Sequence, residues 1–241
     1  MAGHSKWSNI KHRKGAQDAK KGKIFTKIIK EITVSTRIGG SDLESNSRLR
    51  KAIQSAKSNN MPFDNIKRAI KKGSGSLAGV KFEKVIYEGY GPSGVAIMLE
   101  VITDNKNRSV AEIRNTFSKF GGKLGENGSV SWLFEKKGII ILKLNNSTEE
   151  ILYELAIKAG VEDIEKNQEV YIIKLNPKVI YTLKEKFDKN GFSIVSVDIE
   201  LIPKTYQIIK HHELEKLNML FEIFENNEDI NTFYSNFKID G

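Results

Sequence analysis

The amino-acid sequence predicts an α+β protein with three domains: an N-terminal basic domain of three helices, then two α/β domains of ferredoxin-like pattern, the last inserted in the middle one. Two observations lead to this prediction. Apolar residues recur at helical spacing up to about residue 73 and at strand spacing beyond it, with a Gly- and Ser-rich segment between. After residue 136 the elements follow the order strand-helix-strand-strand-helix-strand. The predicted domains are residues 1–78, residues 79–136 plus 205–241, and residues 137–204.

The first domain is predicted to contain three helices. Apolar residues at helical spacing indicate the first over residues 16–38, and the Gly-Gly pair that follows ends it. A second helix is predicted over 47–58. The third begins at Pro62, which suits a first helical turn, and ends at Gly73. Residues 73–79 have the composition of a linker, so a domain boundary is placed there.

The middle domain begins where the hydrophobic period changes to two. Residues 82–90 and 95–103 are predicted as a hairpin, because the segment between them is rich in Gly and Pro. Residues 109–112 (Ser-Val-Ala-Glu) have the spacing of a capping box, which would open a helix ending near Lys119. A strand is predicted over 129–135. This set lacks a second helix to cover its sheet.

The inserted domain is predicted as a complete βαββαβ unit of ferredoxin-like type. Its strands are expected at 139–144, 162–166, 169–175 and 192–201, and its helices at 148–159 and 177–189. A final helix (213–225) and strand (232–238) are too small to fold alone, so they are expected to return to the middle domain. Separate domains joined in series are the alternative.

Charge is distributed unevenly along the chain. Residues 1–80 contain 18 Lys and Arg against 5 Asp and Glu, whereas residues 81–241 contain 21 against 25. A basic end on a mildly acidic body is typical of a polyanion-binding module. The alternative is a solvated basic face that serves solubility.

A basic face is expected on the first helix, opposite its apolar stripe, because Lys23, Lys27 and Lys30 lie within about 60° of one another on a helical wheel. Such an array of ammonium groups attracts phosphates through counterion release. The candidate nucleic-acid-binding residues are Lys6, Trp7, Lys11, His12, Arg13, Lys14, Lys20, Lys21, Lys23, Lys27, Lys30, Lys67, Arg68, Lys71 and Lys72. Lysines that merely face water are the alternative for the first helix taken alone.

The basic start of the chain includes an aromatic residue and two histidines. Trp7 could stack on a base or anchor the arm to the bundle. A metal site at His4 and His12 is not expected, since neither cysteine nor a carboxylate pair accompanies them. Further on, Lys106 and Arg108 precede or open a helix and could contact a phosphate, although an ordinary polar turn is preferred there.

Several classes of function are excluded or not expected. The chain contains no cysteine, which excludes disulfides, thiolate zinc sites and cysteine nucleophiles. No secretory signal and no membrane span is expected, and a cytoplasmic location follows by default. No catalytic motif is recognisable, and the glycines match neither a P-loop nor a dinucleotide fingerprint. Neither an enzymatic activity, a cofactor nor a small-molecule substrate is therefore expected.

Ten short segments together resemble the YebC/PmpR family, which includes the mitochondrial translational activator of cytochrome c oxidase. They are residues 1–7 (MAGHSKW), 9–14 (NIKHRK), 17–20 (QDAK), 22–27 (GKIFTK), 59–62 (NNMP), 87–92 (YEGYGP), 103–108 (TDNKNR), 117–122 (FSKFGG), 128–130 (GSV) and 134–138 (FEKKG). The resemblance spans the chain and is closest over residues 1–140.

The resemblance implies one helical and two α/β domains and no enzymatic activity. Bacterial members are generally described as transcriptional regulators that bind DNA, and others act in translation on the ribosome. The third domain of the family tends to be acidic. Here that character is diluted by Lys143, Lys158, Lys166, Lys174 and Lys178.

The expected function is therefore a nucleic-acid-binding regulator of gene expression, most simply a DNA-binding transcriptional regulator. A translation factor that contacts ribosomal or transfer RNA and associates with the ribosome is the first alternative, because the basic module has more lysine than arginine and no recognisable base-reading helix. A protein-interaction scaffold with incidental lysines is the second.

Overall fold

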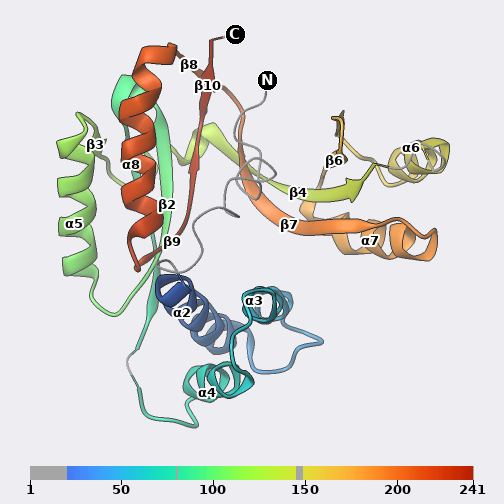
Figure 1. The fold of residues 1–241 in the computed structure, drawn as a ribbon, viewed down its shortest axis with the longest axis horizontal. Helices are drawn as coiled ribbons and strands as arrows, with labels where there is room; N and C mark the ends of the chain where they lie inside the picture. Colours follow the sequence, from blue (N-terminus) through green and yellow to red (C-terminus); the bar gives the residue numbers. More distant parts are fainter. Residues whose placement is uncertain (1–20, 80, 145–148, 241) are drawn as a thin grey trace. The chain divides into compact units, whose positions relative to one another are not determined.

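The computed structural model describes residues 21–79, 81–144 and 149–240 (Figure 1). The fold is of the predicted α+β class, with helices first and mainly antiparallel sheets after them. Contacts divide the chain into two units, one comprising Met1–Trp132 and Thr205–Gly241 and the other Leu133–Lys204. The first unit is thus formed by segments on both sides of the second.

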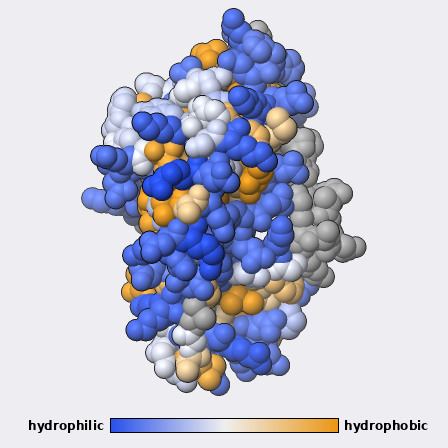
Figure 2. All heavy atoms as spheres, turned by 90° about the vertical axis from the view of Figure 1, so that its left-hand side faces the viewer, coloured by the Kyte–Doolittle hydropathy of each residue, from blue (hydrophilic) through white to orange (hydrophobic). Residues whose placement is uncertain are grey.

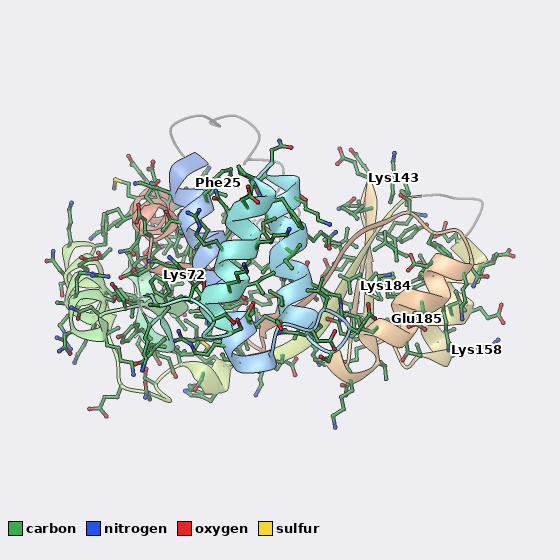
Figure 3. The ribbon with its side chains drawn as sticks, turned by 90° about the horizontal axis from the view of Figure 1, so that it is seen from below. Phe25, Lys72, Lys143, Lys158, Lys184 and Glu185 are labelled. Atoms are coloured by element: carbon green, nitrogen blue, oxygen red, sulfur yellow. The ribbon has the colours of Figure 1, made fainter. Side chains whose placement is uncertain are left out.

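Three helices form the bundle at the start of the described chain: α2 (Lys21–Gly39), α3 (Ser47–Ser58) and α4 (Phe63–Gly73). Phe25 packs at the edge of their common core (Figure 3). Gly73 permits α4 to approach α2 closely, since a β-carbon there would stand 2.5 Å from the carbonyl oxygen of Thr33. The buried core residues are Ile28, Ile32, Leu49, Ala52, Ile53, Ala56, Met61, Ile66 and Ala69.

Asn46 joins the end of α2 to the start of α3. Its side-chain oxygen accepts a hydrogen bond from the backbone N–H of Leu49 at 3.0 Å, which caps α3. Its side-chain nitrogen donates to the carbonyl oxygens of Ser35 and Gly40 at 2.9 and 2.7 Å. One buried amide therefore satisfies three backbone groups and fixes the turn between the two helices.

The sheet of the first unit has the strand order β3-β1-β2-β9, and every pairing is antiparallel. The strands are β1 (Glu83–Tyr90), β2 (Ala96–Thr103), β3 (Lys123–Leu124) and β9 (Ile230–Ser235). A 3₁₀ turn, η2 (Pro92–Gly94), connects β1 to β2. The strand β9, which follows the second unit in sequence, thus extends a sheet whose other strands precede that unit.

Helices α5 (Lys106–Lys119) and α8 (Leu214–Asn226) lie side by side and cover one face of this sheet (Figure 1). Their apolar sides meet at Phe117 and Phe224, whose ring centroids are 5.3 Å apart. Figure 2 shows the side on which α5 lies: hydrophilic side chains cover most of it, and hydrophobic residues form small separate groups. The buried core residues from these elements include Val95, Ile97, Leu99, Val101, Ile113, Phe117, Leu217, Leu220, Phe221, Phe224 and Ile230.

The C-terminal segment contains two strands where one was predicted. β9 ends at Ser235, and β10 (Phe237–Ile239) pairs in parallel with β8 (Gln207–Ile209), a strand that the sequence did not reveal. Between β9 and β10 the buried Asn236 accepts a hydrogen bond from the backbone N–H of Ala96 at 2.8 Å. The backbone N–H of Asn236 donates to the carbonyl oxygen of Ala96 at 3.2 Å, so this residue links the end of β9 to the start of β2 through both its backbone and its side chain.

The capping box predicted over residues 109–112 is wrong. The N-cap of α5 is Asn105, whose side-chain oxygen accepts from the backbone N–H of Arg108 at 3.0 Å, so the helix begins at Lys106. Ser109 lies inside the helix, and its buried hydroxyl donates to the carboxylate of Asp229, outside the helix. Local spacing would assign Ser109 to an N-cap, but its hydroxyl is instead engaged in a tertiary hydrogen bond to Asp229.

The strand predicted over 129–135 is also wrong. A 3₁₀ turn, η3 (Ser131–Leu133), is followed by β4 (Phe134–Lys143), which runs without a break through Gly138. The two strands expected on either side of residue 137 are therefore one strand of the second unit. The third strand of the first sheet is instead the two-residue β3.

The second unit has the ferredoxin-like strand order β5-β6-β4-β7, again antiparallel throughout. Its remaining elements are α6 (Glu149–Lys158), β5 (Asp163–Lys166), β6 (Val170–Leu175), the 3₁₀ turn η5 (Pro177–Val179), α7 (Ile180–Lys189) and β7 (Ile194–Pro203). Its core includes Ile140, Leu142, Leu152, Tyr171, Ile173, Leu183 and Phe187.

Asp229, in the turn between α8 and β9, connects the helical bundle to the sheet. Its carboxylate accepts from Lys30 of α2 at 2.6 Å and from Arg108 of α5 at 3.0 Å. It also accepts from the hydroxyls of Ser109 and Thr103 at 2.7 and 3.1 Å. The Lys30 and Asp229 side chains are only 10% and 8% exposed. Side chains from three elements, α2, α5 and β2, thus converge on one buried carboxylate.

The electrostatics of this carboxylate follow from its partners. Burial alone would raise the pKa of Asp229, but the hydrogen bonds from Lys30, Ser109 and Arg108 outweigh it and lower the pKa from 3.8 to about 2. A shift of this size corresponds to about 2 kcal/mol of folding free energy at neutral pH. The ionised form is therefore the one that the fold stabilises.

A second polar cluster joins the bundle to the same sheet. Arg48 of α3 forms a bidentate ion pair with Glu31 of α2, at 2.6 and 2.9 Å, and also pairs with Glu100 of β2 at 3.1 Å. Lys84 of β1 pairs with Glu100 at 2.6 Å, and Asn231 of β9 donates to Glu31 at 3.1 Å. Two independent networks therefore fix the bundle on the sheet of the first unit.

We expect the substitution Asp229→Asn to lower the free energy of unfolding by about 2–3 kcal/mol at pH 7, because it leaves Lys30 buried without a counter-charge. The exposed Asp240→Asn should change it by less than about 0.5 kcal/mol. Urea unfolding followed by circular dichroism measures both. Because the folded pKa is depressed, the wild-type advantage should be full above about pH 4 and disappear as the pH falls towards 2. An advantage that persists unchanged at pH 2 contradicts the assignment.

Candidate nucleic-acid interface

The outer face of α4 presents a group of cations to solvent, which we call the α4 basic face. Lys67, Arg68 and Lys71 are exposed and Lys72 is half-buried. Within the described part of the chain, no carboxylate forms an ion pair with any of the four. Figure 3 views the bundle from the side on which α4 lies and labels Lys72 on this helix. These four predicted residues are thus brought together on one helix.

An exposed aromatic ring lies beside these cations and was missed by the sequence analysis. Phe63, the first residue of α4, is 60% exposed, and the Lys67 ammonium group lies 4.7 Å from the centroid of its ring. Spacing alone would assign Phe63 to the buried stripe, because Ile66 and Ile70 follow it at helical intervals. The ring lies at the end of the helix, and among the described residues no neighbouring element buries it.

The lysines of α2 divide into different environments. Lys23 is exposed, whereas the half-buried Lys27 donates a hydrogen bond to the carbonyl oxygen of Glu225 at 2.8 Å. Lys30 is buried in its pair with Asp229. The predicted row of three solvent-facing ammonium groups is therefore wrong at Lys30. The helical wheel shows the face that packs in the bundle but cannot show that the opposite face packs against the sheet.

Helix α3 adds further cations that the sequence analysis did not single out. Lys57 is exposed at the C-terminal end of the helix, where a positive charge interacts favourably with the helix dipole. Arg50 is exposed too, but its guanidinium group donates to the carbonyl oxygens of Leu43 and Glu44. Arg48 is engaged in the cluster with Glu31 and Glu100. Of these three, Lys57 is the one available to a ligand.

The predicted arm residues lie outside the described residues. They are Lys6, Trp7, Lys11, His12, Arg13, Lys14 and Lys20, and Lys21 is the first residue of α2.

The possible phosphate site at the start of α5 is occupied by the protein itself. Lys106 pairs with Glu83 at 2.5 Å, and this hydrogen bond raises the pKa of Lys106. Arg108 is held between Asp229 and Asp104, at 3.0 and 2.7 Å, and its pKa is raised for the same reason. The capped turn that the sequence analysis preferred is therefore what the geometry supports.

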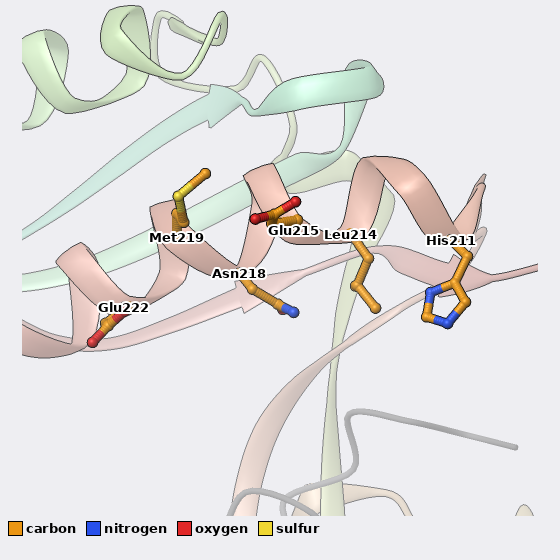
Figure 4. Close-up of a pocket in the computed structure, with 6 residues that line it drawn as sticks. All are labelled: His211, Leu214, Glu215, Asn218, Met219 and Glu222. Carbon is orange, nitrogen blue, oxygen red and sulfur yellow. The ribbon is translucent and has the colours of Figure 1, made fainter.

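A shallow groove follows the outer side of α8 (Figure 4). It is lined by His211 of the preceding 3₁₀ turn η6 (His211–Glu213) and, along α8, by Leu214, Glu215, Asn218, Met219 and Glu222; these side chains do not converge on one point. Across residues 21–79, 81–144 and 149–240, no cluster of His, Asp or Glu side chains is suited to hold a metal ion. No helix in the same ranges is long and apolar enough to cross a membrane.

The second unit carries both signs of charge on its surface (Figure 3). Lys158 pairs with Glu154, Lys166 with Glu149, and Lys174 with Asp163 and Glu165. Lys143 and Lys178 are exposed. Most of the lysines that dilute the acidity of this unit are thus neutralised within it, which distinguishes its surface from the α4 basic face.

Comparison with known proteins covers nearly the whole chain. Residues 5–76 match the profile described as the TACO1/YebC protein N-terminal domain, and residues 82–237 match the TACO1/YebC second and third domain. A probable transcriptional regulatory protein of Persephonella marina is 51% identical over 241 residues, with 99% of this chain and 96% of that protein covered. One of Geobacter sulfurreducens is 48% identical over 239 residues, with the same coverage.

A solved structure gives the same result for the fold. A conserved hypothetical protein of Aquifex aeolicus superposes with a TM-score of 0.84 at 45% sequence identity, and the match covers 98% of both chains.

Substitutions at Arg108 and Lys71 should have separate effects, one on the stability of the fold and the other on nucleic-acid affinity. We expect Arg108→Ala to lower the free energy of unfolding by about 1–2 kcal/mol, because the buried carboxylate of Asp229 loses a charged hydrogen-bond partner. It should leave affinity for a short labelled oligonucleotide unchanged, as measured by fluorescence anisotropy. Lys71→Ala should leave the free energy of unfolding nearly unchanged and lower the affinity for the oligonucleotide, since the Lys71 side chain is exposed on α4. Weaker nucleic-acid binding by a folded Arg108→Ala protein would restore Arg108 as a phosphate contact.

Proposed function

Because the chain belongs to the TACO1/YebC family, we propose that it is a nucleic-acid-binding regulator of gene expression, in the first place a DNA-binding transcriptional regulator in the cytoplasm. The names of its relatives support this proposal, since those of Persephonella marina and Geobacter sulfurreducens are described as probable transcriptional regulatory proteins. We also propose that it has no catalytic activity and takes neither a cofactor nor a small-molecule substrate.

The observation that carries the proposal is the α4 basic face. Lys67, Arg68 and Lys71 follow one another at positions that share a side of the helix, and all are exposed. Cations so arranged neutralise consecutive backbone phosphates and release the counterions condensed on them. Binding of this kind positions the protein on the nucleic acid and carries no sequence information by itself.

The bundle is also held in a fixed orientation. The Asp229 network and the Arg48 cluster attach α2 and α3 to the sheet of the first unit, whereas α4 is turned outward. A basic surface on a rigid frame loses little conformational entropy when it binds a ligand. This geometry supports a binding role for the bundle and a supporting role for the sheet.

An RNA-binding translation factor that associates with the ribosome is the second candidate. The observation that favours it is Phe63, an exposed ring in contact with Lys67, because unpaired bases stack on aromatic side chains. The outer face of α4 contains one arginine and no exposed asparagine or glutamine with which to read base pairs in a major groove. Phosphate contact with stacking is the chemistry of looped or single-stranded RNA.

A protein-interaction scaffold is the third candidate. It predicts that the exposed cations serve solubility and that nucleic-acid affinity does not depend on them. This candidate is distinguished from the other two by charge reversal on the α4 basic face.

We expect the triple variant Lys67→Glu, Arg68→Glu and Lys71→Glu to lower affinity for duplex DNA at least about tenfold at low salt, and to reduce the slope of log affinity against log salt by about three. A mobility-shift assay between about 50 and 200 mM salt measures both quantities. The matched control reverses the exposed Lys143, Lys178 and Lys189 of the second unit, with the same change in net charge.

The outcomes separate the candidates. Loss of affinity in the α4 variant but not in the control supports the proposed interface, and equal affinity in both would favour the scaffold. Preference for a promoter fragment over random duplex of equal length supports a transcriptional regulator. Co-sedimentation with ribosomes at low salt, lost in the α4 variant, supports the translation factor.

A further inference from the structure

Two exposed aromatic side chains at one end of β1 donate to the same oxygen atom. The hydroxyl of Tyr90 and the indole Nε1 of Trp132 bond to the carbonyl oxygen of Ser129 at 3.0 and 3.1 Å. The two residues are nevertheless 37% and 63% exposed. Their polar atoms therefore face the protein, and their exposed area belongs to the rings. A surface tryptophan whose only donor is already satisfied offers a ligand its π face alone.

The loop that carries Ser129 is fixed by a buried carboxylate. Glu88, which is 5% exposed, accepts from the backbone N–H groups of Gly128, Val130 and Ser131 at 2.9, 2.8 and 2.8 Å. Burial alone would raise the pKa of Glu88, but these hydrogen bonds outweigh it and the pKa is lowered. Since the ionised carboxylate closes the loop, the two rings are preorganised for a ligand.

A lysine lies next to Tyr90. Lys123 of β3 is directly opposite Tyr90 in the ladder, so both side chains point to the same face of the sheet, and Lys123 is exposed. Successive residues of a strand point to opposite faces, and Gly89, which precedes Tyr90 in β1, approaches Phe117 of α5. Tyr90 and Lys123 therefore lie on the face opposite α5. The loop also exposes Glu126, whereas the charge of Glu88 is buried and fully engaged.

These contacts select one kind of ligand. A proline-rich peptide on an aromatic surface needs donors for its carbonyl groups, and the donors of Tyr90 and Trp132 are already used. An unpaired base needs only a ring to stack on, and the adjacent phosphate needs a cation. The rings and Lys123 supply both.

We propose that Tyr90 and Trp132 form a stacking platform for unpaired bases of single-stranded nucleic acid, with Lys123 beside the flanking phosphate. The platform belongs to the first unit and shares no residue with the α4 basic face. It is therefore a second contact, and its existence does not depend on the function proposed for the helical bundle.

The direct test is fluorine NMR of the full chain labelled with 5-fluorotryptophan. The chain contains two tryptophans, Trp7 and Trp132, so the Trp132→Phe variant assigns the signals. Three 12-nucleotide probes of equal charge are added: oligouridylate, oligothymidylate and an abasic strand. The Trp132 signal should shift with either base-containing strand and stay in place with the abasic strand. Comparing the two shifts identifies RNA or DNA as the preferred source of the base.

Affinity measurements complete the test. Trp132→Ala and Tyr90→Ala should each weaken binding of the single strand about tenfold and leave binding of a duplex unchanged. Trp132→Phe and Tyr90→Phe keep a ring and should retain most of the affinity, which separates stacking from loss of the fold. Circular dichroism checks that each variant is folded.

Two results would overturn the platform: a Trp132 signal that no base-containing strand shifts, or single-strand affinity unchanged in Trp132→Ala. A shift produced only by oligoproline would assign the surface to a peptide instead. The α4 triple variant keeps the two proposals apart. With the platform intact, that variant should still show the Trp132 shift although it has lost duplex binding.

Discussion

The structure of the first unit depends on the buried pair between Lys30 and Asp229. Lys30 lies in the first described helix and Asp229 in the turn before β9, so this ion pair brings together residues 199 positions apart. Arg108 and Ser109 complete the shell around the carboxylate. Removing one partner leaves the other charge buried without a counter-charge, which destabilises the fold by more than the pair itself stabilises it. Buried electrostatic contacts thus help to fix the bundle on the sheet.

This pair also explains what the sequence could and could not predict. Period and turn chemistry were sufficient for the helices of the bundle, the first hairpin and the ferredoxin-like order of the second unit. They failed at Lys30 and Ser109, where a residue with an ordinary local role is recruited by Asp229. They failed again at β4, because a Lys-Lys-Gly segment has turn composition yet lies within a continuous ladder. Each error arises where a distant partner overrides local preference.

The same reasoning applies to the candidate sites. Composition located the basic module, and three of the four predicted cations of α4 are exposed. Composition could not distinguish a lysine buried in an ion pair, such as Lys30, from one that is exposed and available to a ligand. Nor could it find Phe63 or Trp132, since aromatic residues at these spacings are usually buried. Exposure of a ring is a property of the ends of elements and of the folded loops beside them.

The two exposed aromatic sites differ in a way that bears on their ligands. Phe63 is covered on one side by the Lys67 ammonium group, so a base that stacks there meets a cation at once. Tyr90 and Trp132 are instead held by hydrogen bonds to one carbonyl, with Lys123 at the adjacent strand. A continuous duplex offers backbone phosphates but keeps its base faces stacked and inaccessible. A duplex would therefore engage the cations of the α4 basic face alone, whereas a nucleic acid with unpaired bases would engage the exposed rings as well.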